Sequence, residues 1–191
     1  MNPNQYQHLR TLQDYYATHH VLPTQVTLTR LWKMSRSSVA RLWGKFKEWG
    51  YLATTPDGKP KPAPRFFERA LCPAVRAGEP SMVEGDFIEQ MRIDDYLVEQ
   101  PSRTLLIRVK GDSMQEAGIQ DGDIAVVEQT QQASHGAIVV AQVDGEFTLK
   151  YLQLKGGQPI LQPANSAYAP IIPRESLQII GVVTGLFRRY H

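Results

Sequence analysis

Two residues of this chain, Ser113 and Lys150, could together carry out nucleophilic chemistry. Ser113 lies in the turn Gly111-Asp112-Ser113-Met114, which follows an expected strand. Because glycine permits a tight turn and a close approach of another backbone, a serine there is exposed, as a nucleophile must be. Lys150 lies in an expected strand among the apolar residues Phe147, Leu149 and Leu152. Burial disfavours a charged amine, so a neutral lysine could accept the serine proton, as in Ser-Lys variants of the catalytic triad.

Each residue has a plainer interpretation when it is taken alone, since a turn serine is usually structural and a strand lysine usually faces solvent. Spacing and context favour the pair. Lys110 is close to Ser113 along the chain and is a second candidate base, although the Thr148-Leu149-Lys150 context favours Lys150. The histidines are poor alternatives, because they lie in the N-terminal part, in a polar loop or at the last position: His8, His19, His20, His135 and His191.

The single cysteine, Cys72, has no partner for an internal disulfide or a CxxC motif. This fits a reducing compartment and argues against a structural zinc site, so we expect no metal and no cofactor. No stretch has the roughly 18 uncharged apolar residues of a membrane helix, and the first residues lack the pattern of a signal peptide. Six Phe, eight Tyr and three Trp help to supply a core, which excludes general disorder. We therefore expect a globular protein in the cytoplasm.

The elements that would position Ser113 and Lys150 are short strands separated by Gly and Asp turns. The strands are expected at residues 104–109, 124–128, 137–143, 146–152, 159–161, 171–172 and 177–187. This pattern predicts a mostly antiparallel β-domain.

The N-terminal part has a helical pattern instead. Apolar spacing predicts a helix from Gln5 to His19, a short helix after Thr24, and a longer one from Arg36 to Trp49. The inward positions are expected to be Leu9, Leu12, Tyr15 and Tyr16, then Val26, Leu28, Leu31 and Trp32, then Val39, Leu42, Trp43, Phe46 and Trp49. Tyr51-Leu52-Ala53 and an Asp57-Gly58 turn follow. The order predicts a winged helix-turn-helix.

Charge divides the chain in the same way. Residues 1–70 hold 11 Lys or Arg against 4 Asp or Glu, whereas residues 71–191 hold 10 against 15. The basic half favours a polyanionic partner, although a helical dimerisation or protein-docking module would also fit. Expected contacts with bases in the DNA major groove are Ser37, Ser38, Arg41 and Lys45, and expected phosphate contacts are Arg36, Lys59 and Lys61.

A proline-rich run from Thr54 to Pro64 predicts a turn that leads into an extended linker. The fold class is therefore α+β in two domains. We expect a winged helix at residues 1–64, a linker segment at 65–82, and a β-rich domain at 83–191.

Several ordered motifs resemble the LexA and UmuD family of self-cleaving proteins, which includes phage repressors. They are Gly111-Asp112-Ser113-Met114, Gly118-Ile119, Asp121-Gly122-Asp123-Ile124 and Thr148-Leu149-Lys150, with the lysine 37 residues after the serine. The resemblance implies that Ser113 is the nucleophile, that Lys150 is the general base, and that Ala77-Gly78, within Val75-Arg76-Ala77-Gly78-Glu79-Pro80, is the bond cleaved. It also implies a LexA/signal-peptidase-like fold for the β-domain.

The resemblance further implies a homodimer formed by the C-terminal domain, operator double-stranded DNA as a ligand, and a RecA filament on single-stranded DNA that stimulates cleavage. The final strand, residues 179–187, is rich in apolar residues and is a candidate for the dimer contact. The expected protein is thus an SOS repressor that inactivates itself.

Two other functions are weighed against the repressor. A UmuD-like accessory subunit of an error-prone polymerase would also be activated by self-cleavage, although UmuD-like proteins lack a winged helix. A signal-peptidase-like enzyme that acts on other proteins is disfavoured, because no membrane anchor is found.

Overall fold

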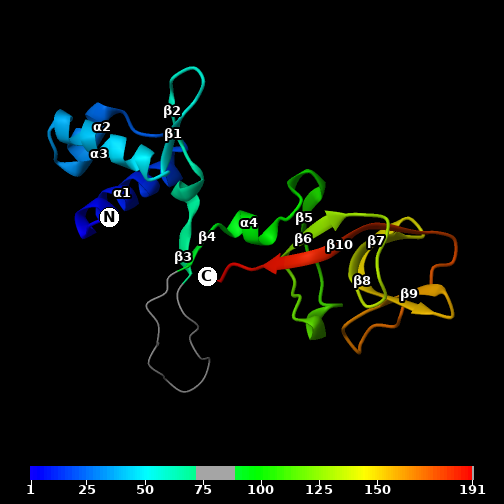
Figure 1. The fold of residues 1–191 in the computed structure, drawn as a ribbon. Coiled ribbons are helices and arrows are strands. Elements are labelled where there is room, and N and C mark those ends of the chain that lie inside the picture. The colour runs from blue at the N-terminus through cyan, green and yellow to red at the C-terminus, as the bar shows by residue number, and fades with distance from the viewer. Residues whose placement is uncertain (72–88, 191) are drawn as a thin grey trace. The chain divides into compact units, whose positions relative to one another are not determined.

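The computed structural model describes residues 1–71 and 89–190, which form two compact units, Met1–Ile93 and Asp94–His191 (Figure 1). The first unit is mainly helical and the second is built around an antiparallel sheet. This confirms the predicted α+β fold class. In the described part of the chain, no helix is both long and apolar enough to cross a lipid bilayer.

Three helices open the first unit: α1 (Pro3–His19), α2 (Gln25–Trp32) and α3 (Arg36–Glu48). Each begins where a polar side chain caps it, because the side chains of Asn2, Thr24 and Ser35 accept hydrogen bonds from backbone N–H groups of the first turn. The expected helices are therefore present, and the predicted cap at Thr24 is confirmed.

The helices enclose a small core. It consists of nine buried residues, namely Leu9, Leu12, Leu28, Trp32, Val39, Leu42, Phe46, Leu52 and Phe66. The prediction for the second helix was partly wrong, because Val26 and Leu31 are 45% and 41% exposed. A helix of eight residues presents one narrow face to the core, and Leu28 and Trp32, four positions apart, occupy it.

The proline-rich run forms the wing. Strands β1 (Leu52–Thr54) and β2 (Pro60–Pro62) pair antiparallel, with Leu52 opposite Pro62 and Thr54 opposite Pro60. A wing around the Asp57-Gly58 turn was predicted, although the same run was also expected to lead into an extended linker. Prolines are tolerated in a two-stranded sheet because each strand has a free edge. A 3-10 helix, η1 (Pro64–Phe67), follows and places Phe66 in the core of the first unit. Strands β3 (Arg69–Leu71) and β4 (Glu89–Met91) then pair antiparallel.

The second unit contains a six-stranded antiparallel sheet with the order β5-β6-β10-β7-β8-β9 (Figure 1). The strands are β5 (Thr104–Arg108), β6 (Ile124–Gln129), β7 (Ile138–Val143), β8 (Glu146–Lys155), β9 (Gln158–Gln162) and β10 (Leu177–Phe187). Ile171, for which a separate strand was predicted, forms an isolated bridge with Leu161. The short helices α4 (Ile93–Leu97), η2 (Pro101–Arg103) and η3 (Gln115–Ala117) complete the described elements.

Strand β10 is central rather than peripheral, since it pairs with β6 along one side and with β7 along the other. Apolar clusters lie against different residues of this strand, Ile179 and Val182 in one cluster and Ile180 and Val183 in another. Its apolar side chains are only partly covered within the domain, because Gly181 is the one residue of the strand that is fully buried. The pairing is partial on each side, since β6 pairs with residues 181–187 and β7 with residues 177–182, so the dimer contact expected at this strand stays a prediction.

Candidate active site

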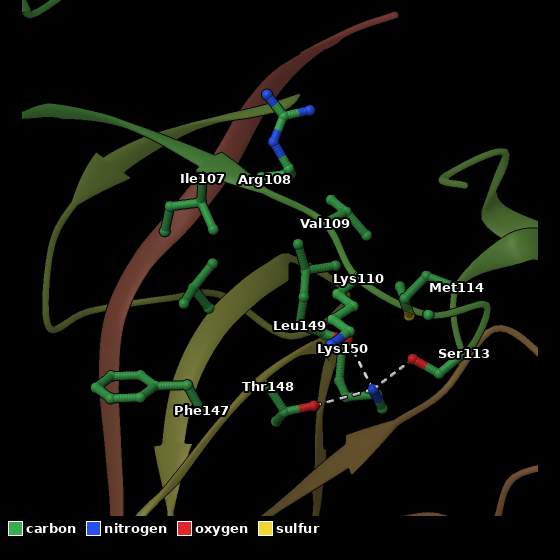
Figure 2. A pocket seen from close by; sticks show the side chains of 12 residues that line it. Ile107, Arg108, Val109, Lys110, Ser113, Met114, Phe147, Thr148, Leu149 and Lys150 are labelled. Carbon is green, nitrogen blue, oxygen red and sulfur yellow. Dashed lines mark hydrogen bonds between the residues drawn. The ribbon is translucent and has the colours of Figure 1, made fainter. Parts of the chain in front are cut away.

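Ser113 and Lys150 meet in a cleft of about 240 Å³ in the second unit (Figure 2). The cleft is lined by β5, the turn after it, one residue of β7 and the start of β8: Ile107, Arg108, Val109, Lys110, Gly111, Ser113, Met114, Val140, Phe147, Thr148, Leu149 and Lys150. Residues far apart in the sequence thus share one concave surface, as expected for an active site.

The turn that carries Ser113 is shaped by Gly111, whose φ of 89° lies in the left-handed region that favours glycine. The Gly111 N–H donates a hydrogen bond of 2.7 Å to the Asp121 side chain, and the Gln115 N–H donates one of 3.0 Å to the Asp112 carbonyl. Together these bonds fix the backbone on both sides of the serine.

The Lys150 amine is held by three oxygen atoms. It lies 2.7 Å from Ser113 Oγ, 3.0 Å from Thr148 Oγ1 and 2.9 Å from the Leu149 carbonyl oxygen. Figure 2 shows Ser113 and Thr148 on either side of the amine. A neutral amine has two N–H donors and one lone pair, so it can donate to Thr148 and Leu149 while it accepts the Ser113 proton.

Burial favours this neutral form. Lys150 is only 6% exposed, and this desolvation lowers the pKa of its amine from the ordinary value of 10.5. Among the described residues, no carboxylate forms an ion pair with it that would oppose the shift. The geometry and the direction of the pKa shift both suit a general base.

The other candidate bases have different surroundings. Lys110 lines the cleft, but within the described residues the only side chain that hydrogen-bonds Ser113 Oγ is that of Lys150. No histidine lines the cleft, and His135 instead accepts a hydrogen bond from the Leu154 N–H. No cluster of potential metal ligands occurs in residues 1–71 and 89–190.

The remaining predicted site residues are distributed as follows. The expected cleavage bond, Ala77-Gly78, and Cys72 lie outside the described residues. On the first unit, the predicted DNA contacts Arg36, Ser37, Arg41, Lys45, Lys59 and Lys61 are exposed, whereas Ser38 is half-buried. Lys59 forms an exposed ion pair of 3.0 Å with Asp57 across the tip of the wing.

Two side chains near the nucleophile were missed in the sequence. Asn165 donates to the Asp112 carbonyl oxygen, and the Tyr168 hydroxyl donates to the Asp112 carboxylate. Both lie in the loop between β9 and β10, more than 50 residues after Asp112. A run of Pro, Ala, Asn and Ser resembles any surface loop, so no local signal links it to the serine.

Thr148 was predicted only as part of the Thr148-Leu149-Lys150 motif, with no role of its own. Its hydroxyl has a defined contact here, since it accepts from the Lys150 amine. The alternation of side chains along a strand provides a signal, because residues two apart point to the same face. Thr148 and Lys150 are such a pair on β8.

Comparisons with known proteins agree with this geometry. The model of the peptidase S24-like family matches residues 70–184. Protein SamA of Salmonella typhimurium is 41% identical over 140 residues, which cover 72% of this chain and 95% of SamA. LexA repressor 2 of Pseudomonas putida is 35% identical over 188 residues, which cover 93% of each protein. Protein ImpA of Escherichia coli is 36% identical over 128 residues, which cover 66% of this chain and 83% of ImpA.

Proposed function

Because the chain belongs to the peptidase S24-like family, whose members are self-cleaving serine peptidases, we propose that it is a LexA-like repressor of the SOS response. It binds operator DNA as a dimer in the cytoplasm and inactivates itself by cutting Ala77-Gly78. The observation that carries the proposal is the Ser113-Lys150 contact of 2.7 Å in a chain whose first unit is a basic winged helix. The match to LexA repressor 2 includes that first unit, since it covers 93% of the chain.

In the proposed reaction, Ser113 Oγ attacks the carbonyl carbon of Ala77 and its proton passes to the Lys150 amine. The resulting oxyanion is stabilised by backbone N–H groups at Asp112 and Ser113. The bond to Gly78 then breaks, and Lys150 returns the proton to the departing Gly78 nitrogen. Water hydrolyses the ester on Ser113, which leaves fragments of residues 1–77 and 78–191. Because the cleaved bond belongs to the same molecule, docking of its segment controls the rate.

The first unit would read DNA through α3 and the wing. A helix fits the major groove, and Ser37, Ser38, Arg41 and Lys45 are the proposed groove contacts. Arg36, Lys59 and Lys61 would contact phosphates and orient the unit. The exposure of Arg36, Arg41, Lys45 and Lys61 supports the assignment, because a buried cation would be a poorer ligand for DNA. Lys59 is also exposed, but it would have to exchange its ion pair with Asp57 for a phosphate.

Cleavage would act as a switch through avidity. A homodimer held by the C-terminal domain presents two DNA-binding units to a palindromic operator. Cutting at Ala77-Gly78 separates each DNA-binding unit from the dimer. Each unit then dissociates from its half-site independently, because the avidity of the dimer is lost. A RecA filament on single-stranded DNA is the proposed stimulus, in line with the resemblance to LexA repressors.

Self-cleavage is tested by incubating the purified chain at alkaline pH, or with RecA, nucleotide and single-stranded DNA. Mass spectrometry should then find residues 1–77 and 78–191. Ser113→Ala and Lys150→Ala should block the reaction and keep DNA binding, whereas Lys110→Ala, the matched control in the same cleft, should still be cleaved. Intact chain under both conditions would refute the proposal.

A UmuD-like accessory subunit of an error-prone polymerase is the second candidate, because the resemblance to UmuD-like proteins applies equally to the peptidase unit. However, the matches to SamA and ImpA cover 72% and 66% of this chain, whereas the match to LexA repressor 2 covers 93%. Gel shifts with the DNA upstream of its own reading frame separate the two functions. A salt-sensitive, sequence-selective complex supports the repressor, and its absence supports the accessory subunit.

A further inference from the structure

The loop of residues 163–168, here called the clasp, holds the turn that carries Ser113 (Pro163-Ala164-Asn165-Ser166-Ala167-Tyr168). The Ala164 N–H donates to the Ser113 carbonyl oxygen at 2.9 Å, and the Glu116 N–H donates to the Ala164 carbonyl oxygen at 2.8 Å. The Ser166 N–H donates to the Glu116 carboxylate at 2.9 Å. These bonds join Ala164 and Ser166 of the clasp to Ser113 and to Glu116 in η3, which follows the turn.

Asn165 is the buried polar group of the clasp, with 5% exposure. Its amide nitrogen donates to the Asp112 carbonyl oxygen at 3.0 Å and lies 3.4 Å from the Asp112 carboxylate. Its amide oxygen accepts from the Ala167 N–H at 2.9 Å. Because these bonds engage both ends of the amide, the orientation of the Asn165 side chain is fixed.

The clasp thereby anchors both peptide groups that flank the Ser113 Cα. Asn165 holds the carbonyl of the peptide between Asp112 and Ser113, and Ala164 holds the carbonyl of the next peptide. The carbonyl and the N–H of one peptide are coplanar and point in opposite directions. A fixed Asp112 carbonyl therefore also fixes the Ser113 N–H, which has no acceptor among the described residues.

Lys150 comes from a different strand, so the contact between its amine and Ser113 Oγ depends on where the turn is held. We propose that Asn165 is a positioning residue for the nucleophile: its hydrogen bond to the Asp112 carbonyl sets the Ser113 hydroxyl toward Lys150 and orients the Ser113 N–H toward the oxyanion. This inference rests on the proposed role of Ser113.

Tyr168 provides a contrast within the same loop. Its hydroxyl donates to the Asp112 carboxylate, a side-chain group, and not to the backbone beside the nucleophile. Removal of that hydroxyl leaves the Asn165 and Ala164 bonds in place. A substitution of Asn165 therefore tests support of the Asp112-Ser113 peptide, and a substitution of Tyr168 tests support of the Asp112 side chain.

The test compares Asn165→Asp with Tyr168→Phe in the full chain. Asn165→Asp keeps the shape and the acceptor for the Ala167 N–H, but it replaces the donor with an oxygen that repels the Asp112 carbonyl. We expect the self-cleavage rate of Asn165→Asp to fall about 10- to 100-fold, since a displaced nucleophile and a lost oxyanion donor have effects of this order. Tyr168→Phe should lose less than about threefold.

The shape of the pH-rate profile distinguishes positioning from general disruption. Asn165→Ala also removes the donor, adds no charge near Lys150 and leaves it buried, so in this variant the pH at which the rate levels off should stay unchanged while the level itself falls. A shift of that pH would overturn the proposal. If Asn165→Asp fails to fold, as judged by near-ultraviolet circular dichroism, the self-cleavage rate of Asn165→Ala replaces it and should fall in the same way.

Labelling of Ser113 by a small phosphonofluoridate removes the need for a docked cleavage segment. Ser113 should be labelled in the unsubstituted chain, and in Asn165→Asp the labelling should slow by the same factor as cleavage. Equal labelling of the two proteins overturns the positioning role and leaves the proposed function intact. No labelling of the unsubstituted chain refutes Ser113 as the nucleophile, and the inference falls with it.

Discussion

Substitution of Arg188 by alanine should strongly destabilise the peptidase unit. Arg188 follows β10, and its guanidinium forms two hydrogen bonds with the carboxylate of Asp123, one of them 2.7 Å long, and a third of 2.9 Å with the Gly118 carbonyl oxygen. Asp123 has no exposed surface, and its other acceptor contact is with the Gln120 N–H at 2.8 Å. Arg188→Ala therefore leaves a buried carboxylate without its counter-charge.

The expected cost is about 3–5 kcal/mol, the range for removal of one partner from a buried ion pair. A matched control exists in the same unit, because Arg103 forms an ion pair of 2.8 Å with Glu128. That pair is solvent-exposed, with side-chain exposures of 53% and 26%, so Arg103→Ala should cost no more than about 1 kcal/mol. Total stabilities are about 5–15 kcal/mol, so only the first substitution threatens the fold.

The cost should depend on pH in a defined direction. Hydrogen bonds from Arg188 lower the pKa of Asp123 below its ordinary value of 3.8, so the stability they provide is present above that value and is lost as the pH falls through the folded-state pKa. Without Arg188, burial raises the pKa of Asp123, and mild acid neutralises the buried charge. The difference between Arg188→Ala and the parent should therefore shrink as the pH is lowered.

The assay is hydrogen exchange measured by mass spectrometry in increasing urea, in a Ser113→Ala background that prevents self-cleavage. Peptides from 104–129 and 177–190 report on the peptidase unit. All three tryptophans, Trp32, Trp43 and Trp49, lie in the first unit, so their fluorescence provides an internal control that should not change. The reasoning is refuted if Arg188→Ala costs no more than Arg103→Ala, or if its cost grows in acid.

Three further predictions concern the site, the sheet and the proposed contact of the first unit with DNA. The self-cleavage rate should rise up to tenfold per pH unit and level off below pH 10.5, because burial lowers the pKa of Lys150. A time course of fragment formation at each pH measures this rate. A rate that does not change with pH would exclude Lys150 as the base. Gly181→Ala should destabilise the peptidase unit by about 1–3 kcal/mol in the same exchange assay, since its Cβ would lie 2.4 Å from the Glu128 carbonyl oxygen. Gly185→Ala should cost less, because its nearest contact is a leucine side chain at 3.3 Å, and equal costs would contradict the packing argument. Arg36→Ala should reduce the salt dependence of operator binding by about one unit in the log-log slope, as measured by fluorescence anisotropy, whereas Lys155→Ala at the end of β8 should leave it unchanged. An unchanged slope for Arg36→Ala would argue against a phosphate contact there.

Local patterns predicted most of the elements correctly. The alternating run of β8 and the long apolar run of β10 were found with nearly correct ends, and Thr24 marked the start of the second helix. The Ser113-Lys150 pair could be proposed because a glycine turn and an apolar strand are local signals. The structure adds the 2.7 Å contact between the two side chains.

The features that were missed depend on contacts between distant segments. Asn165 lies 53 residues from Asp112, and nothing in its own neighbourhood indicates a buried partner. The same holds for the position of β10 between β6 and β7, which its own apolar run does not indicate. Val26 and Leu31 were misplaced because composition does not say which face of a short helix meets the core.

The central position of β10 has a consequence for how the protein is made. Ser113 follows β5, on the β5-β6 side of this strand, whereas Lys150 lies on β8, on the β7-β8-β9 side. Until residues 177–187 have left the ribosome, no strand joins β6 to β7, and the serine and the lysine belong to separate pieces of sheet. A nascent chain that ends before residue 177 therefore lacks the strand that joins the serine-bearing and the lysine-bearing parts of the sheet.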